Sequence, residues 1–163
     1  MTVAWRPSLH EAWKTAGITT LQPPEATGID GPCVIVSVCG IRCGSHVLAF
    51  RRPCGGYTMP GGKLEEEDGG ILACASRETE EECGIALPPA SWDVIATSVL
   101  QTAAKTYVLV LCSVELEEYP SKFDAESLGM EALDLFSDFP ALGGNGPLFE
   151  AMRAQCHAVD GGA

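Results

Sequence analysis

Apolar positions along the chain fall into short runs whose spacing predicts strands and helices in alternation. Mainly apolar runs bounded by turn residues predict buried strands, and they cover 34–38, 47–50, 92–100 and 106–115. Helices are predicted between capping residues over 8–17, 70–83 and 147–156, and a short strand or turn over 126–136. Because strands and helices alternate without an internal repeat, the chain is predicted to form one α/β domain.

Proline and glycine residues mark the predicted boundaries between these elements. A hairpin turn is predicted over 40–45, and a glycine-rich loop over 55–62 leads toward the long helix. Residues 1–31 are predicted to form an N-terminal extension with one short helix. Residues 32–157 are predicted to form the main domain, and residues 158–163 a flexible tail.

The predicted helix over 70–83 gathers its acidic residues on one face. Its core-facing positions share one arc: Leu72, Ala75, Thr79 and Cys83. The carboxylates of Glu78, Glu81 and Glu82 lie on a separate arc, where like charges one turn apart cost roughly a few tenths of a kcal/mol per pair. Acidic residues are also disfavoured near the negative C-terminal end of a helix. A bound Mg²⁺ would explain the cluster because it takes oxygen ligands, and a solvated acidic helix face is the alternative.

The charge balance narrows the classes of partner. The chain has 10 Lys and Arg residues against 22 Asp and Glu residues, a formal net charge of −12. Such a surface repels nucleic acid and anionic membranes, so the predicted partner is a small molecule. A cation on the acidic helix would reverse the local field and admit an anionic substrate. The oligomeric state stays open, and a homodimer is compatible with the sequence.

Composition and cysteine spacing predict a cytoplasmic protein without a zinc site. Apolar residues make up 46% of the chain and charged residues 20%, which is typical of a globular domain. No apolar run approaches the roughly 18 residues of a membrane span, and the N-terminus has no apolar segment typical of a secretory signal. The eight cysteines include no Cys-x-x-Cys pair, so reduced and mostly buried thiols are predicted.

Residues 62–85 resemble the Nudix box, G-x5-E-x7-R-E-U-x-E-E-x-G-U, in which U is a bulky apolar residue. The second half of the box matches to its end, and residues 59–65 resemble the entrance L-P-G-G-K-x-E. The spacing departs at one point, because eight residues instead of seven separate Asp68 from Arg77. The loop has therefore gained one residue, and Asp68 or Glu67 stands in for the first Glu of the box.

The resemblance implies a Nudix-type α/β/α sandwich with a mixed β-sheet. It also implies a Mg²⁺-dependent pyrophosphohydrolase, with Mn²⁺ as a substitute, that cleaves a nucleoside triphosphate or related nucleotide to a monophosphate and pyrophosphate. The metal would neutralise diphosphate oxygens and lower the pKa of a bound water. By this resemblance the metal ligands are Glu78, Glu81, Glu82 and Gly62, and one carboxylate acts as base. Arg77 would hold one of these glutamates in place.

Candidates for substrate contact lie beside the box. Arg51 and Arg52 end a strand that is predicted to face the site, and either could hold a phosphate with two hydrogen bonds. The backbone of Gly61 and Gly62 can approach a ligand closely because neither residue has a side chain. Tyr57 takes the place of an aromatic residue often found before the box. Its role there is either core packing or stacking on a base.

Glu126 begins a segment that resembles part of the Nudix nucleoside triphosphate pyrophosphatases, and it is a candidate metal ligand or base. Two other functions are compatible with the sequence. One is hydrolysis of a non-nucleotide diphosphate, such as a prenyl or sugar diphosphate, and the other is nucleotide binding by a catalytically inactive Nudix-fold module. The retained Glu78, Glu81 and Glu82 argue against the inactive module, and the lengthened loop argues for it.

Overall fold

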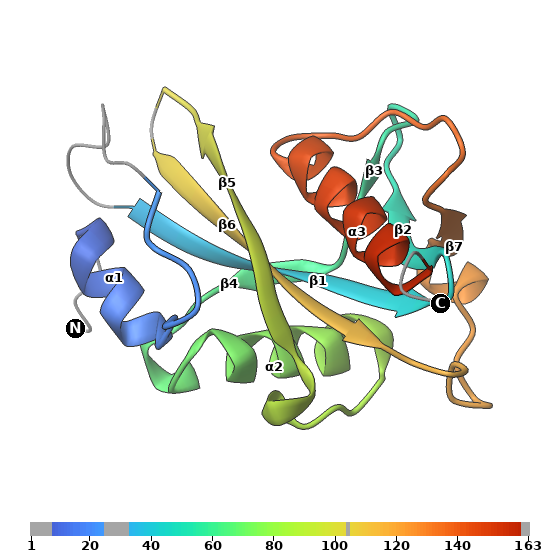
Figure 1. Cartoon of the computed structure of the whole chain (residues 1–163), viewed down its shortest axis with the longest axis horizontal. Coiled ribbons are helices and arrows are strands. Elements are labelled where there is room, and N and C mark those ends of the chain that lie inside the picture. Colours follow the sequence, from blue (N-terminus) through green and yellow to red (C-terminus); the bar gives the residue numbers. More distant parts are fainter. Residues whose placement is uncertain (1–7, 25–32, 104, 161–163) are drawn as a thin grey trace.

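The computed structural model describes residues 8–24, 33–103 and 105–160 as one β-sheet between two layers of helices (Figure 1). The helices are α1 (Leu9–Ala16), α2 (Ile71–Cys83) and α3 (Asn145–Asp160). The strands are β1 (Cys33–Cys43), β2 (His46–Arg51), β3 (Tyr57–Thr58), β4 (Gly61–Lys63), β5 (Asp93–Gln101), β6 (Thr106–Glu115) and β7 (Met130–Asp134). Single 3₁₀ turns cover Glu66–Asp68, Pro89–Ser91 and Glu126–Leu128. The α/β/α sandwich expected from the sequence is confirmed.

The seven-stranded sheet is mixed, and β1 lies at its centre. β1 runs parallel to β6 from the pair Cys33–Thr106 to the pair Arg42–Glu115. On its other side β1 pairs in antiparallel fashion with β4 and then with β2. β2 also pairs with β3 and β7. The glycine-rich segment that ends in β4 therefore lies against the middle of β1, beside α2.

Each face of the sheet has its own buried cluster. The cluster under α2 includes Ile35 and Ile71, whereas the cluster under α3 includes Phe149 and Met152. Leu9 and Trp13 of α1 belong to the first cluster, together with Ala12 and Ala16. Burial of a large apolar side chain stabilises a fold by about 1.5–3 kcal/mol, so the described part of the N-terminal extension is part of the main core.

Capping residues set the ends of the first two helices as the sequence predicts. The Ser8 hydroxyl accepts a hydrogen bond from the Glu11 backbone N–H at 3.2 Å, which begins α1. Gly17 and Gly84 end α1 and α2 in the left-handed conformation, with φ of 68° and 70°.

The predicted turn over 40–45 is wrong at its start, because β1 continues to Cys43 and the chain reverses only at Gly44 and Ser45. Gly40 does not form a turn, and its role is in the packing of α3 against the sheet. A Cβ at Gly40 would lie 2.6 Å from the Met152 sulfur, so glycine at this position lets α3 approach the sheet closely.

Three further details differ from the sequence predictions. α3 begins at Asn145, which makes Pro147 its third residue, and it continues to Asp160, past the predicted start of the tail at 158. Residues 161–163 lie outside the described part of the chain. On α2, Leu72 is only half-buried, and Ile71 and Cys74 are fully buried instead. The loop predicted over 55–62 contains β3 and the start of β4.

Within the described part of the chain, no helix has both the length and the apolar character needed to cross a membrane.

Candidate active site

The candidate site lies where α2 passes over β4. Gly61 of β4 pairs with Val38, and Gly62 pairs with Ser37. A Cβ on Gly61 would lie 2.0 Å from the backbone oxygen of Ser37, so this close strand pairing requires glycine. A Cβ on Gly62 would lie 2.2 Å from the carboxyl carbon of Glu78. Gly61 thus admits the neighbouring strand, and Gly62 admits the Glu78 carboxylate.

Glu78 and Glu82, one helical turn apart, bring their carboxyl groups together beside β4. Burial raises the pKa of Glu82 to about 7, and the charge of Glu78 adds to this effect. A hydrogen bond from the Gly61 backbone N–H and the positive charge of Arg52 act in the opposite direction. The Glu78 side chain is 12% exposed. The two carboxyl groups therefore share a confined space in which their negative charges repel.

Arg77 holds one edge of this carboxylate pair. Its Nε and Nη2 atoms lie 2.6 and 3.0 Å from the two carboxylate oxygens of Asp68. Its Nη1 atom lies 2.9 Å from Oε1 of Glu78, and Nη2 also donates to the backbone oxygen of Lys63 at 3.1 Å. The bidentate bond to Asp68 raises the pKa of Arg77 further above its ordinary value. Arg77 thus contacts Glu78 from the side.

Asp68 occupies the position that the lengthened loop left open, because its carboxylate reaches Arg77. Asp68 also accepts a hydrogen bond from the backbone N–H of Glu65 at 2.8 Å, which closes the 3₁₀ turn. The added residue is accommodated by Gly69 and Gly70, whose φ values of 78° and 155° favour glycine. Glu67 is exposed on the same turn.

Glu81 does not join the carboxylate pair. Its side chain is 58% exposed, and one carboxylate oxygen lies 3.4 Å from Nη1 of Arg77. Across the described residues, no group of three or more His, Cys, Asp or Glu side chains forms a metal-binding arrangement. The structure therefore brings together two of the three predicted carboxylates, with Arg77 between them and Glu81.

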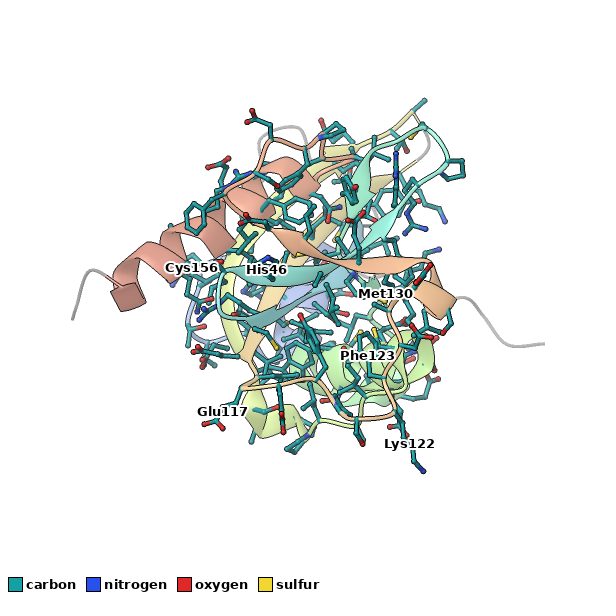
Figure 2. The ribbon with its side chains drawn as sticks, turned by 90° about the vertical axis from the view of Figure 1, so that its right-hand side faces the viewer. His46, Glu117, Lys122, Phe123, Met130 and Cys156 are labelled. Carbon is teal, nitrogen blue, oxygen red and sulfur yellow. The ribbon has the colours of Figure 1, made fainter. Side chains whose placement is uncertain are left out.

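The segment that begins at Glu126 contacts the C-terminal end of α2. It begins the 3₁₀ turn before β7 and is exposed. Met130, the first residue of β7, lies over the end of α2, where its sulfur is 3.8 Å from the sulfur of Cys83 (Figure 2). The turn that contains Glu126 therefore lies on the same side of the molecule as the C-terminal end of α2.

Arg51 is the last residue of β2 and Arg52 follows it, and the two side chains have different neighbours. Arg52 Nε donates to the Thr58 hydroxyl at 2.9 Å, and the charge of Arg52 acts on Glu82. The charge of Arg51 acts instead on Tyr57. The Tyr57 ring packs edge-on against Phe139, with centroids 6.0 Å apart. Tyr57 therefore packs into the α3 side, away from the carboxylates.

Asn145 is a positioning residue that the sequence analysis did not single out. Its side-chain oxygen accepts a hydrogen bond from the backbone N–H of Met59 at 3.0 Å, and Asn145 is buried. This bond ties the start of α3 to the glycine-rich segment. In the sequence Asn145 indicates only a helix start, because a contact across 86 positions has no local pattern.

The donor set fits a divalent metal at Glu78 and Glu82. Carboxylate oxygens are the preferred ligands of Mg²⁺, and a cation between the two groups would relieve the repulsion of their negative charges. The Gly62 backbone oxygen accepts a hydrogen bond from the Ser37 hydroxyl at 3.3 Å. Glu81 lies on the exposed side of the same helix, where it contacts Arg77.

Asp68→Asn is expected to lower the melting temperature by roughly 5 °C, because a charged bidentate bond contributes about 1.5–3 kcal/mol. Burial would raise the pKa of Asp68, but the hydrogen bonds from Arg77 and Glu65 outweigh it and lower the pKa. The bond thus stabilises the fold above the unfolded pKa of Asp, and its contribution is lost as the pH falls through the lower folded value. Thermal melts of Asp68→Asn and of the exposed Glu67→Gln test this, and equal shifts would contradict the assignment.

The sequence around this site matches a known family of protein domains. A family model described as the NUDIX domain matches residues 32–135, which is most of the main domain. None of the curated protein sequences matches the chain.

Several solved structures share the fold. The ORF135 protein of E. coli is 22% identical, with a TM-score of 0.58, over 77% of this chain and 92% of that one. A MutT protein from Methanosarcina mazei Go1 is 19% identical, with a TM-score of 0.58, over 77% and 96% of the two chains. The NUDIX domain of Shewanella oneidensis NrtR, solved with ADP ribose, is 14% identical, with a TM-score of 0.60, over 79% and 92%. At these identities the likeness is one of fold.

Proposed function

The chain belongs to the Nudix family of hydrolases, which act on diphosphate anhydride bonds, and from this membership we propose that it is a Mg²⁺-dependent nucleotide pyrophosphohydrolase. Its proposed reaction converts a nucleoside triphosphate or a related nucleotide to a nucleoside monophosphate and pyrophosphate. Mn²⁺ is proposed to substitute for Mg²⁺. The proposed setting is the cytoplasm, with a small nucleotide as the partner.

The observation that carries this proposal is the Glu78–Glu82 pair beside Gly62. Two carboxyl groups in one half-buried space repel each other, and the bond from Arg77 to Glu78 offsets only part of that cost. A Cβ at Gly62 would fill the space that the Glu78 carboxylate occupies. This arrangement supports a site kept for a divalent cation and an anionic ligand, because an inactive module gains nothing from the repulsion.

In the proposed reaction Glu78 and Glu82 would hold the metal, and Glu81 and the Gly62 backbone oxygen would be further ligands. When bound, the metal supplies charge neutralisation for the diphosphate and a lowered pKa for water. Arg77 keeps Glu78 oriented through the 2.9 Å contact. The backbone N–H of Gly61 orients Glu82. One carboxylate of this group would accept the proton of the attacking water, and Glu126 is the second candidate for that step.

A substrate screen tests the proposal directly. The chain is incubated with nucleoside triphosphates, ADP-ribose, dinucleoside polyphosphates, and prenyl and sugar diphosphates, each with Mg²⁺ or Mn²⁺. Phosphate release is followed after addition of pyrophosphatase, and monophosphate products are identified by chromatography. Release of pyrophosphate from a triphosphate supports the proposal. Turnover of a non-nucleotide diphosphate alone would assign the other hydrolase class, and no turnover at all would assign a binding module.

Metal and nucleotide are expected to bind cooperatively. At a net charge of −12 the metal-free protein repels a triphosphate, so Mg²⁺ is expected to raise nucleotide affinity at least about tenfold. Nucleotide must then raise metal affinity by the same factor, because linkage is reciprocal. Melting curves in EDTA, with Mg²⁺, with a non-hydrolysable triphosphate analogue, and with both should show the largest stabilisation for the pair.

Equal stabilisation by the analogue in EDTA and in Mg²⁺ would contradict the proposed metal bridge. The phosphates would then be held by arginine or by backbone amides alone. Glu80→Gln, on the exposed side of α2, is a matched control for a general change of charge, and it should leave the pattern of the melting series unchanged.

A further inference from the structure

We infer that Arg52, and not its neighbour Arg51, binds a phosphate oxygen of the substrate, and that Thr58 is the positioning residue that aims Arg52 at the site. The inference rests on the proposed function only in taking a diphosphate as the ligand. The sequence alone does not distinguish Arg51 from Arg52, and Thr58 is not part of any motif.

Side chains at the end of the β2–β3 hairpin alternate between the two faces of the sheet. Phe50 pairs with Thr58 and Arg51 pairs with Tyr57 across the two strands. Side chains of directly paired residues lie on the same face. Phe50 packs against the cluster under α2, whereas Tyr57 packs against the cluster under α3. Thr58 therefore faces the α2 side of the sheet, where the carboxylate pair lies.

Arg52 is held on the α2 side by two contacts. Its Nε atom donates to the Thr58 hydroxyl at 2.9 Å, and its guanidinium carbon lies 5.1 Å from the centre of the Phe50 ring. A hydrogen bond at Nε and a ring under the guanidinium plane together restrict a long side chain that is otherwise mobile. Neither of its terminal nitrogens bonds to any group in the described part of the chain, so both are available as donors.

The bond to Thr58 holds the guanidinium near the candidate site. Thr58 is the last residue of β3 and lies three residues before Gly61 of β4, the strand that lies against Glu78. No ion pair joins Arg52 to a carboxylate among the described residues. An arginine beside the site whose terminal nitrogens have no partner among the described residues can donate two hydrogen bonds to a phosphate.

Arg51 has a different neighbourhood. The Tyr57 hydroxyl forms a hydrogen bond with Glu131, which raises the pKa of Tyr57, and the charge of Arg51 opposes this effect. Glu131 pairs with Ala49, two residues before Arg51 on β2, and so lies on the same face as Arg51. By strand pairing Arg51 therefore lies on the α3 side, with Tyr57 and Glu131.

The experiment measures binding of inorganic pyrophosphate with Mg²⁺ by titration calorimetry, which requires no turnover. Arg52→Ala is expected to weaken binding at least tenfold, because charge-assisted hydrogen bonds are lost. Arg51→Ala is expected to change the dissociation constant by less than about twofold. Weakened binding in both variants to the same degree would overturn the choice between the arginines, and absence of pyrophosphate binding by the unchanged protein would overturn the inference as a whole.

Thr58 is tested by a pair of substitutions of similar size. Thr58→Val removes the acceptor for Arg52 and is expected to weaken pyrophosphate binding about three- to tenfold, with KM of a turned-over substrate rising and kcat nearly constant. Thr58→Ser keeps the hydroxyl and is expected to restore affinity. Equal affinity in Thr58→Val and the unchanged protein would overturn the positioning role. Because this binding assay is independent of hydrolysis, failure of the nucleotide screen would leave its outcome intact.

Discussion

Replacing Glu82 with Gln is expected to lower kcat/KM for the nucleotide substrate at least about a hundredfold, the scale of losing metal-assisted catalysis. Glutamine keeps the size of the side chain and can still accept the Gly61 backbone hydrogen bond. It cannot carry the charge that a divalent cation requires. Steady-state kinetics at saturating Mg²⁺ measure the loss, and isothermal titration of Mg²⁺ measures whether metal affinity falls with it.

The same exchange is expected to leave the fold intact and to raise the melting temperature slightly in EDTA. Glu82 and Glu78 repel each other in the metal-free protein, and a neutral amide removes that repulsion. Glu80→Gln on the exposed side of α2 provides the matched control, because it removes one charge from the same helix away from the pair. Wild-type activity in Glu82→Gln would exclude Glu82 from the reacting complex.

The long elements of the fold are predictable because their pattern is local. The strand predicted over 106–115 has the same bounds as β6, which is buried on both faces and therefore reads as a continuous apolar run. β3 and β4 have two and three residues and carry no such pattern. They exist because β2 and β1 supply their hydrogen bonds, and a partner distant in the sequence cannot be read from the short segment itself.

The acidic face of α2 is predictable from helical periodicity, but its division into two groups is not. The sequence places Glu78, Glu81 and Glu82 on one arc. In the structure Arg77 draws Glu81 outward, while Gly62 makes room for Glu78. Both effects depend on β4 and on the loop after it. A helical wheel includes neither β4 nor that loop. It therefore predicts which face is acidic but not how the three carboxylates are arranged on that face.

The substituted first acid of the box shows a similar limit. Spacing left Asp68 and Glu67 as equal candidates, because the loop is one residue longer than the family pattern. Two consecutive glycines, Gly69 and Gly70, let the chain turn so that the shorter aspartate side chain reaches Arg77. Glycine pairs indicate a turn in the sequence, but which carboxylate the turn presents depends on where Arg77 lies.

Gly62→Ala is expected to lower kcat/KM by about a hundredfold while the protein still folds. The new Cβ would lie 2.2 Å from the Glu78 carboxyl carbon, and the carboxylate is the far end of a flexible side chain, so it would swing away. Displacement of a catalytic group by about 1 Å is enough for a loss of this size. The backbone at Gly62 does not have a positive φ, so alanine causes no backbone strain there.

Gly61→Ala is the informative contrast, because its Cβ would meet backbone instead of a side chain. The Ser37 carbonyl oxygen would lie 2.0 Å away, and neither strand can move without breaking the β1–β4 pairing. A loss of stability of at least about 2 kcal/mol is expected, as for an overpacked core. Thermal melts and kinetics on both variants separate the two effects. If Gly62→Ala kept full activity, Glu78 would not be needed in the position where the structure holds it, and the carboxylate pair could not be the metal site.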